Sequence, residues 1–243
     1  MKAMILAAGR GERMRPLTDT LPKPLLRVGG KPLIVWHIEN LVRAGFTQIV
    51  INHAHLGHLI EAALGDGSRF GAHIHYSSEP EALETAGGIT QALPLLGKDP
   101  FLVVNGDIYI DYDFSRAREI AMAMRANAEL FAAYLVLANN PLHHAQGDFA
   151  LAHSKVKLSG KTMLTFTGVA VYQPDVFRDI APGSKAKLAP LLETLIENDL
   201  VRGEHHRGTW VDVGTPQRLA TLDRMLTSSA TPPNAMRPYE PLP

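Results

Sequence analysis

The first stretch of the sequence with residues suited to chemistry is LAAGRGERMRPLTDTLPKPL, residues 6–25, directly behind a short apolar run. Gly9 and Gly11 allow the backbone to turn tightly, so that amide N–H groups can point at a phosphate. Arg13 and Lys23 add cations: the guanidinium fork grips two oxygens, and the ammonium acts as a mobile point charge. These residue types favour a site for a phosphate-bearing ligand.

Three prolines in the same stretch, Pro16, Pro22 and Pro24, are incompatible with a regular helix after the turn. We expect them to hold the chain extended, so that Lys23 returns to the phosphates after the glycine turn has passed beneath them. The alternative is an ordinary loop between a strand and a helix with solvated cations, since glycine turns often follow strands.

Two other phosphate motifs fit this stretch poorly. A dinucleotide-binding loop needs a third glycine, but Met14 stands at that position and the second strand ends in Asn52 rather than an acid. The Gly-Lys-Ser/Thr of a P-loop is absent from the sequence. A nicotinamide-dependent dehydrogenase is therefore a disfavoured alternative.

Two aspartates follow apolar strands far apart in the chain. Asp107 ends FLVVNGD, and Asp212 lies in GTWVDVG. Carboxylates at strand ends project into the crevice where α/β proteins bind ligands, and Mg²⁺ is usually held by one or two acids together with phosphate oxygens. The pair favours a magnesium site, with a turn former or helix cap as the alternative for each residue.

The glycine pair Gly87 and Gly88 in LETAGGI stands at the expected mouth of a helix, open to a nucleobase or a phosphate, although a threonine-capped helix entry explains it equally well. Seven histidines occur in strand-end or paired positions, but their spacing matches no compact zinc pattern, so we interpret them as loop or surface residues. These are His53, His55, His58, His143, His144, His205 and His206.

Composition limits the classes of partner. The 243 residues include 24 Lys and Arg, 24 Asp and Glu, and no cysteine. A balanced charge gives no general field for nucleic acid or an acidic membrane, so an anionic ligand must be held by a local cation cluster. The lack of cysteine fits a reducing cytoplasm, and the short N-terminal apolar run is too short for a signal or a membrane span. We expect a cytoplasmic protein with small-molecule partners.

Strand-length apolar runs alternate with helical patterns. Strands are expected at 3–7, 48–52, 73–77, 101–105 and 130–137, and helices at 33–45, 56–64, 87–96, 114–128, 187–199 and 216–226. This alternation predicts an α/β fold with a Rossmann-like, doubly wound, mainly parallel sheet. Residues 139–174 predict a small antiparallel excursion, with strands at 147–152 and 164–172. We expect one catalytic domain, 1–226, and a disordered tail, 227–243.

The opening stretch, extended to Ile34, resembles the first motif of the sugar-1-phosphate nucleotidyltransferases, and LETAGGI, VNGD, TFTGVAVY and WVDVGTPQRL resemble later motifs of that family in the same order. The resemblance covers residues 1–226 and implies the nucleotide-diphospho-sugar transferase fold. It implies catalytic roles for Arg13, Lys23 and Asp107, and Mg²⁺ held by Asp107 and Asp212. The nucleotide-binding residues that it implies are Ala7, Ala8, Gly9, Gly11, Arg13, Lys23, Glu79 or Glu84, and Gly88.

The acceptor side is less directly readable. The residues expected to bind the sugar are Asn105, Gly147, Asp148 and Thr167. Within the family, INHAHLGHLIEAALGDGSRFG, HHAQGDF and GEHHRGTWVDVGT resemble members that use UTP and N-acetylmuramate α-1-phosphate in bacterial cell-wall recycling. Guanylyl or thymidylyl transfer to a hexose phosphate, and a non-catalytic nucleotide-sugar sensor, remain alternatives. The expected state is a monomer or a small homo-oligomer.

Overall fold

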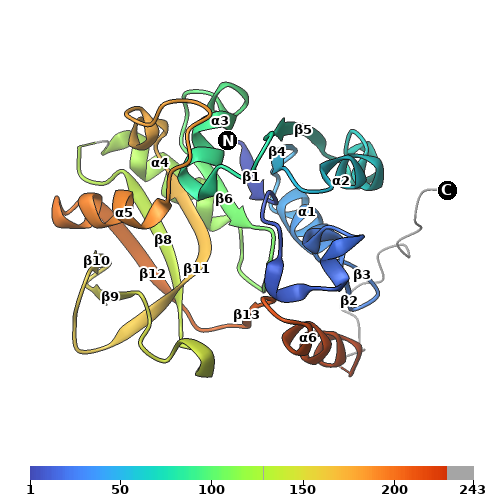
Figure 1. Cartoon of the computed structure of the whole chain (residues 1–243). Helices are drawn as coiled ribbons and strands as arrows, with labels where there is room; N and C mark the ends of the chain where they lie inside the picture. The colour runs from blue at the N-terminus through green and yellow to red at the C-terminus, as the bar shows by residue number, and fades with distance from the viewer. Residues whose placement is uncertain (128, 229–243) are drawn as a thin grey trace.

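A nine-stranded sheet runs through the middle of the computed structural model, which describes residues 1–127 and 129–228 (Figure 1). The strand order is β5-β4-β1-β6-β11-β8-β12-β10-β9. The first half contributes β1 (Ala3–Leu6), β4 (Gln48–His53), β5 (His73–Ser78) and β6 (Phe101–Asn105). The second half contributes β8 (Ala133–Ala138), β9 (Phe149–Ala152), β10 (Lys155–Lys157), β11 (Met163–Tyr172) and β12 (Val201–His206).

Strand direction divides the sheet into two parts. β1 pairs in parallel with β4 and β6, β4 with β5, and β8 with β12. β11 runs antiparallel to both β6 and β8, and the hairpin β9–β10 adds antiparallel pairings to β11 and β12. The predicted α/β class with a mainly parallel sheet is confirmed. The antiparallel excursion extends the central sheet instead of standing apart from it.

Helices cover both faces of this sheet (Figure 1). One face packs on α1 (Leu33–Arg43), α2 (Gly57–Leu64) and α4 (Arg116–Ala126); the other packs on α3 (Glu84–Leu96) and α5 (Leu188–Glu197). Successive residues of β1 serve the two layers in turn: Ile5 joins the first cluster and Met4 the second, and both are fully buried. Each such side chain contributes about 1.5–3 kcal/mol by leaving water.

Two small sheets and the last helix complete the fold. β7 (Ile108–Ile110) pairs with β13 (Trp210–Asp212), and β2 (Arg27–Val28) pairs with β3 (Lys31–Pro32). Helix α6 (Pro216–Ser228) packs on both through a cluster that includes Val28, Val213 and Leu222. Of the expected tail, 227–243, Thr227 and Ser228 belong to α6, and residues 229–243 lie outside the described residues. Among the described residues, no helix has the length and apolar character needed to cross a membrane.

The opening stretch contains no α-helix, but the expectation of an extended segment is wrong in part. It coils through three 3₁₀ turns, η1 (Glu12–Met14), η2 (Leu17–Asp19) and η3 (Lys23–Leu25). Gly11 begins the coil with φ +70°, a left-handed conformation that glycine adopts without strain, and its carbonyl accepts a hydrogen bond from Thr18 Oγ1 at 2.9 Å. The coil folds back on itself, and Lys23 therefore lies against Gly11.

Short 3₁₀ turns also occur elsewhere, as η4 (Ser68–Phe70), η5 (Leu142–His144) and η6 (Pro174–Phe177). Of these, η5 lies in the connection between β8 and β9, next to β13 and α6. This connection, residues 139–148, is called the β8–β9 loop below. It brings residues of the antiparallel half of the sheet to the carboxyl ends of the parallel strands.

Candidate active site

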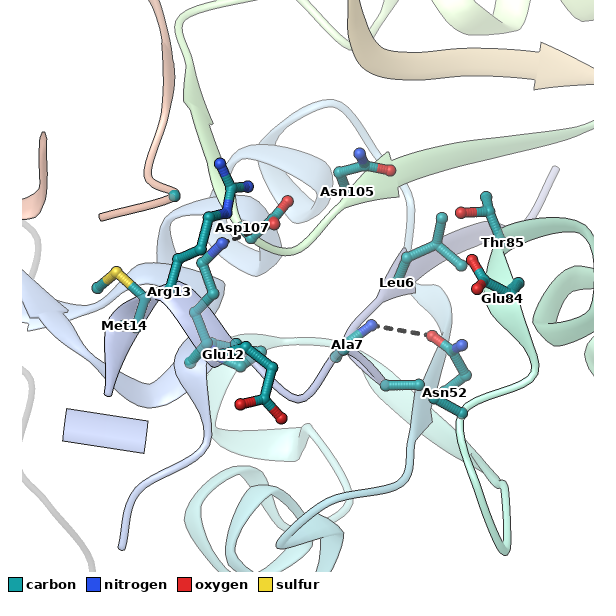
Figure 2. Close-up of a pocket in the computed structure, with 17 residues that line it drawn as sticks. Leu6, Ala7, Glu12, Arg13, Met14, Asn52, Glu84, Thr85, Asn105 and Asp107 are labelled. Carbon is teal, nitrogen blue, oxygen red and sulfur yellow. Dashed lines mark hydrogen bonds and ion pairs between the residues drawn. The ribbon is translucent and has the colours of Figure 1, made fainter. Parts of the chain in front are cut away.

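An open cavity of about 410 Å³ lies at the carboxyl ends of β1, β4 and β6 (Figure 2). This is the edge at which parallel α/β sheets bind their ligands. Nine residues named from the sequence for the site line it together: Ala7, Ala8, Gly9, Gly11, Arg13, Lys23, Glu84, Asn105 and Asp107. The lining also includes residues that the sequence did not single out for this site, among them Glu12, Asn52, Thr85 and Gly214.

Six other predicted residues are not among those that line this cavity. Glu79 and Gly88 lie behind Asn52, Asp212 lies beside the cavity, and Gly147, Asp148 and Thr167 belong to the antiparallel half of the structure. The structure therefore gathers most of the predicted phosphate and catalytic residues in one place together with Asn105, and the other three predicted sugar residues in another.

The cationic wall of the cavity consists of Lys23 and Arg13. Lys23 is 7% exposed, and its Nζ donates a hydrogen bond of 2.7 Å to Asp107 Oδ2. Arg13 is exposed and has no ion pair within the part of the chain that the structure describes. One cation is thus held in place by a carboxylate, while the other is available to an incoming anion.

A buried hydrogen-bond chain forms the opposite wall. The Ala7 N–H donates to Asn52 Oδ1 at 2.9 Å, Asn52 Nδ2 donates to Glu79 Oε1 at 2.7 Å, and the Leu83 N–H donates to Glu79 Oε2 at 2.9 Å. Glu79 is 3% exposed, so its carboxylate does not reach a ligand in the cavity. It orients the side-chain amide of Asn52 instead. Asn52 is the member of this hydrogen-bond chain whose side chain lines the cavity, from the next-to-last position of β4.

The glycine pair lies deeper than its sequence suggested. Helix α3 begins at Glu84, three residues before the expected start, so Gly87 and Gly88 lie inside the helix. The N–H groups of Ala86 and Gly87 both donate to Ala186 O, which satisfies two of the first four N–H groups of the helix without a ligand. A Cβ on Gly88 would lie 2.7 Å from Glu79 Oε1 and 2.8 Å from Asn52 Nδ2. Glu84 and Thr85 line the cavity in place of the glycines.

The two predicted metal ligands lie next to each other. Asp212 is paired with Ile108 in the β7–β13 ladder, and the Val213 N–H donates to the Asp107 carbonyl at 3.0 Å. Each carboxylate has one oxygen bound to a cation: Asp107 Oδ2 to Lys23, and Asp212 Oδ2 to Arg218 at 2.8 Å. The second oxygen of each acid has no side-chain partner within the described residues. Two carboxylates with a free oxygen apiece fit a hard divalent cation whose remaining ligands are phosphate oxygens and water.

A buried histidine supports this pair of acids from below. His37 of α1 is 1% exposed, and its Nε2–H donates to the Ile108 carbonyl at 2.8 Å. Burial lowers the pKa of His37 to about 4, so the ring is neutral at pH 7. The hydrogen bond fixes β7 directly after Asp107. The described residues contain no cluster of three or more His, Cys, Asp or Glu side chains that could hold a metal.

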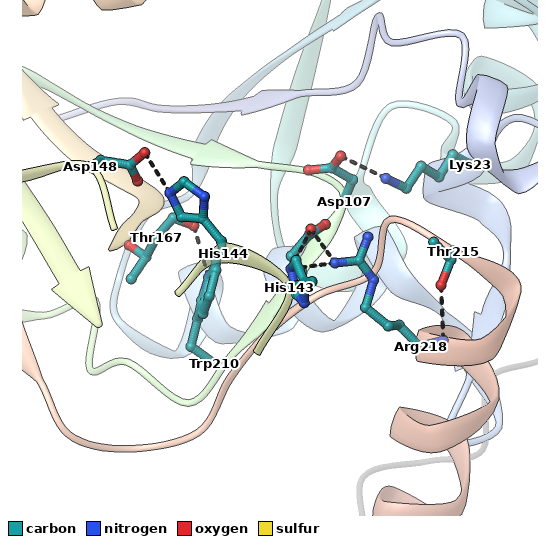
Figure 3. A network of polar contacts seen from close by, with 10 residues as sticks. Lys23, Asp107, His143, His144, Asp148, Thr167, Trp210, Thr215 and Arg218 are labelled. Atoms are coloured by element: carbon teal, nitrogen blue, oxygen red, sulfur yellow. Dashed lines mark hydrogen bonds and ion pairs between the residues drawn. The ribbon is translucent and has the colours of Figure 1, made fainter. Parts of the chain in front are cut away.

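The predicted sugar residues hold the β8–β9 loop in shape (Figure 3). Asp148 accepts hydrogen bonds from His144 Nε2 at 2.9 Å and the Phe166 N–H at 2.8 Å. The Thr167 hydroxyl is buried and donates to the Val136 carbonyl at 2.7 Å. Gly147 packs on Asn140, where a Cβ would lie 2.7 Å from Oδ1. The side chains of Asp148 and Thr167 are thus already satisfied within the protein, and of the four predicted sugar residues only Asn105 lines the cavity.

The fold and the cavity together define a nucleotide-binding α/β protein in which a glycine-turned, cationic loop faces a pair of acids. Known proteins agree with this class. Residues 2–143 match the family model described as nucleotidyl transferase. The chain therefore belongs to the nucleotidyl transferase family.

Two relatives cover nearly the whole chain. The N-acetylmuramate alpha-1-phosphate uridylyltransferase of Neisseria meningitidis serogroup B is 57% identical over 90% of this chain and 95% of its own. The protein of the same name from Caulobacter vibrioides is 36% identical over 92% of this chain and 96% of its own. A solved structure, a putative glucose-1-phosphate thymidylyltransferase from Bacillus anthracis in complex with a sucrose, matches 93% of this chain and 95% of its own with a TM-score of 0.80 at 22% identity. That likeness shows the shared fold.

Proposed function

We propose that this protein transfers a uridylyl group from UTP to N-acetylmuramate α-1-phosphate, giving UDP-N-acetylmuramate and pyrophosphate. The observation that carries the proposal is the convergence of Lys23, Arg13 and Asp107 on one cavity in a chain 57% identical to a uridylyltransferase of that name. The proposal includes a role in the recycling of cell-wall sugars in the cytoplasm, because the acceptor is a phosphorylated cell-wall sugar.

The reaction in this scheme is a single displacement. An oxygen of the acceptor's phosphate forms a bond to the α-phosphorus of UTP, and the bond from that phosphorus to the pyrophosphate oxygen breaks. The attacking phosphate is already ionised, so no proton is removed and no general base is needed. The protein has to align two polyanions and neutralise their charge, which positioning and fixed cations can supply.

Each wall of the cavity has a part in this alignment. Asn52, held by Glu79, keeps the Ala7 segment in place beside the base and ribose. Arg13 binds triphosphate oxygens from the glycine turn. Lys23 sits on Asp107 and places its ammonium at the phosphate whose bonds change. Fixed charges aimed at developing negative charge are worth about 3–4 kcal/mol each in a water-excluded site.

Asp107 and Asp212 would hold Mg²⁺ through their free carboxylate oxygens. Bound there, the ion supplies charge neutralisation and a template for phosphate oxygens. The donor set is all oxygen, as magnesium prefers; Asp212 pairs with Ile108 in the β7–β13 ladder, and Asp107 directly precedes Ile108.

The proposal is tested with a matrix of substrates. Five nucleoside triphosphates are combined with the 1-phosphates of N-acetylmuramate, glucosamine, mannose and glucose, and pyrophosphate release is measured. We expect the largest kcat/KM for UTP with N-acetylmuramate 1-phosphate. A larger value for GTP with mannose 1-phosphate, or for dTTP with glucose 1-phosphate, would assign the protein to another member class of the family. Pyrophosphate from none of the pairs would leave a binding protein as the better account.

A further inference from the structure

Gly214 lines the cavity at a point where two guanidinium groups converge. A Cβ on this residue would lie 2.2 Å from Arg218 Nη2 and 3.1 Å from Arg13 Nη2. Arg13 belongs to η1 and Arg218 to the first turn of α6, so the two cations come from opposite ends of the chain. Two guanidinium groups that lie this close to the same glycine repel each other. An anion bound between them would be attracted to both and would offset the repulsion.

Arg218 uses only part of its hydrogen-bonding capacity (Figure 3). Its Nη1 donates to Asp212 Oδ2 at 2.8 Å and also to His143 Nε2. Its Nε is buried without a hydrogen-bond partner, although the side chain as a whole is 19% exposed. Nε and Nη2 form one edge of the guanidinium, the edge that grips two oxygens of a carboxylate or phosphate side by side. This edge is unused within the described residues.

The partners of Arg218 place it on the acceptor side of the site. His143 belongs to η5 in the β8–β9 loop, and its Nε2 also lies 3.4 Å from Asp212 Oδ2. The loop is fixed by Asn140, which accepts from Thr165 Oγ1 and donates to the Ala145 carbonyl, and by the His144–Asp148 pair. Lys23, in contrast, is tied to Asp107 on the nucleotide side.

We propose that Arg218, with His143 beside it, binds an oxyanion of the acceptor. This inference rests on the proposed function, in which the acceptor carries a phosphate on C1 and, in the case of N-acetylmuramate, also a lactyl carboxylate. Either group presents two oxygens to the unused guanidinium edge. Gly214 lines the cavity and has no Cβ, so Nη2 of that edge lies directly behind the cavity wall.

The test compares Arg218→Gln with Arg224→Gln, a matched variant of an exposed arginine on the same helix whose side chain, among the described residues, bonds only Thr221. Steady-state kinetics are measured with UTP and two acceptors, N-acetylmuramate 1-phosphate and N-acetylglucosamine 1-phosphate, which lacks the carboxylate. We expect Arg218→Gln to raise KM for N-acetylmuramate 1-phosphate about 10- to 100-fold, the effect of losing a charged hydrogen bond, with KM for UTP changed less than about threefold. Arg218→Lys should recover part of the loss, and Arg224→Gln should match the wild type.

The second acceptor identifies the oxyanion. If Arg218 binds the phosphate, KM rises equally for both sugars; if it binds the carboxylate, KM rises for N-acetylmuramate 1-phosphate alone and the preference between the two sugars falls by the same factor. Unchanged KM for both sugars, with a lower kcat, would overturn the inference and leave Arg218 as a residue that only orients Asp212. An equal rise in KM for UTP would assign the subsite to the triphosphate and also overturn it.

A binding measurement separates this inference from the proposed function. Calorimetric titration of N-acetylmuramate 1-phosphate into the wild type and into Arg218→Gln needs no turnover. If the wild type releases no pyrophosphate with any pair of substrates, the proposed function fails, and the difference in acceptor affinity between these two proteins still decides the role of Arg218. Equal affinities would contradict the subsite.

Discussion

Lys23 Nζ lies 2.7 Å from Asp107 Oδ2, which joins a residue of the first loop to one at the end of the fourth parallel strand of the chain. Lys23 is nearly buried, whereas the Asp107 side chain is 43% exposed toward the cavity. The carboxylate therefore holds the ammonium in a defined place, yet keeps a free oxygen in the open. In the proposed reaction this contact positions both the ammonium of Lys23 and the carboxylate of Asp107.

Removing this cation should affect the chemical step most. We predict that Lys23→Ala lowers the single-turnover rate about 10²- to 10³-fold, as expected when one group that stabilises the charge of the transition state is lost. Lys161→Ala, which changes an exposed lysine, is the matched control and should be neutral. Rapid-quench measurement of nucleotide-sugar formation at saturating substrates reads the step directly. A change confined to acceptor affinity would place the role of Lys23 elsewhere.

The two acids should be needed for turnover and not for folding. We predict that Asp107→Ala and Asp212→Ala each lower kcat by orders of magnitude, with far-ultraviolet circular dichroism unchanged. The matched control is Asp175→Ala, an exposed acid in η6 away from the cavity. Activity is measured as a function of magnesium concentration. Near-normal turnover of either variant at limiting magnesium would rule out that residue as a metal ligand.

Substitution by alanine should have different effects at two glycines in and beside the cavity, Gly9 and Gly88. In Gly88→Ala the new methyl group would overlap Glu79 and Asn52, so we predict a loss of about 1–3 kcal/mol in the free energy of unfolding. Gly9 lines the cavity and has no atom within 4 Å of the position of a Cβ, so Gly9→Ala should keep its stability but raise KM for UTP. Urea denaturation and steady-state kinetics distinguish the two. Equal free energies of unfolding for the two variants would contradict the packing assigned to Gly88.

The sequence predicted β1, β4 and β6 closely, because these strands are buried along nearly their whole length and read as continuous apolar runs. The expected strand at 101–105 coincides with β6, and that at 48–52 ends one residue short of β4. β12 was not expected, since its sequence VRGEHH is polar and its pairing with β8 is a tertiary effect. The start of α3 was misplaced because glycine normally disfavours a helix interior, whereas here close packing on Ser184 and Ala186 requires it.

The residues of the candidate site also fall into those that the sequence could predict and those that it could not. Gly11, Arg13, Lys23 and Asp107 could be predicted because their residue types and their positions behind strands indicate phosphate and metal chemistry. Arg218 and Asn52 could not, because each acquires its role from partners distant in sequence: Asp212 and His143 for the arginine, Ala7 and Glu79 for the amide. Thr167 lies on a strand of the expected excursion, but β11 turns its hydroxyl toward Val136.

The buried imidazole predicts a dependence of stability on pH. The pKa of His37 is lowered from 6.5 to about 4 in the folded protein, so between these values the unfolded chain binds a proton that the folded chain does not. Stability is full above pH 6.5 and falls as the pH drops toward 4. We predict that the wild type loses about 3 kcal/mol more than His37→Gln between pH 7 and pH 4. The free energy of unfolding of both proteins is measured by urea denaturation at pH 7 and pH 4. An equal decrease in the two proteins would contradict the prediction.

A competition experiment tests which nucleotide and which sugar phosphate the protein joins. The protein is mixed with equal concentrations of UTP, GTP, dTTP, CTP and ATP, the 1-phosphates of N-acetylmuramate, glucosamine, mannose and glucose, and magnesium, and the nucleotide sugars formed are identified by mass spectrometry at low conversion. We expect UDP-N-acetylmuramate to be the dominant product, with one pyrophosphate released per molecule formed. A dominant GDP- or dTDP-hexose, or pyrophosphate without any nucleotide sugar, would contradict it.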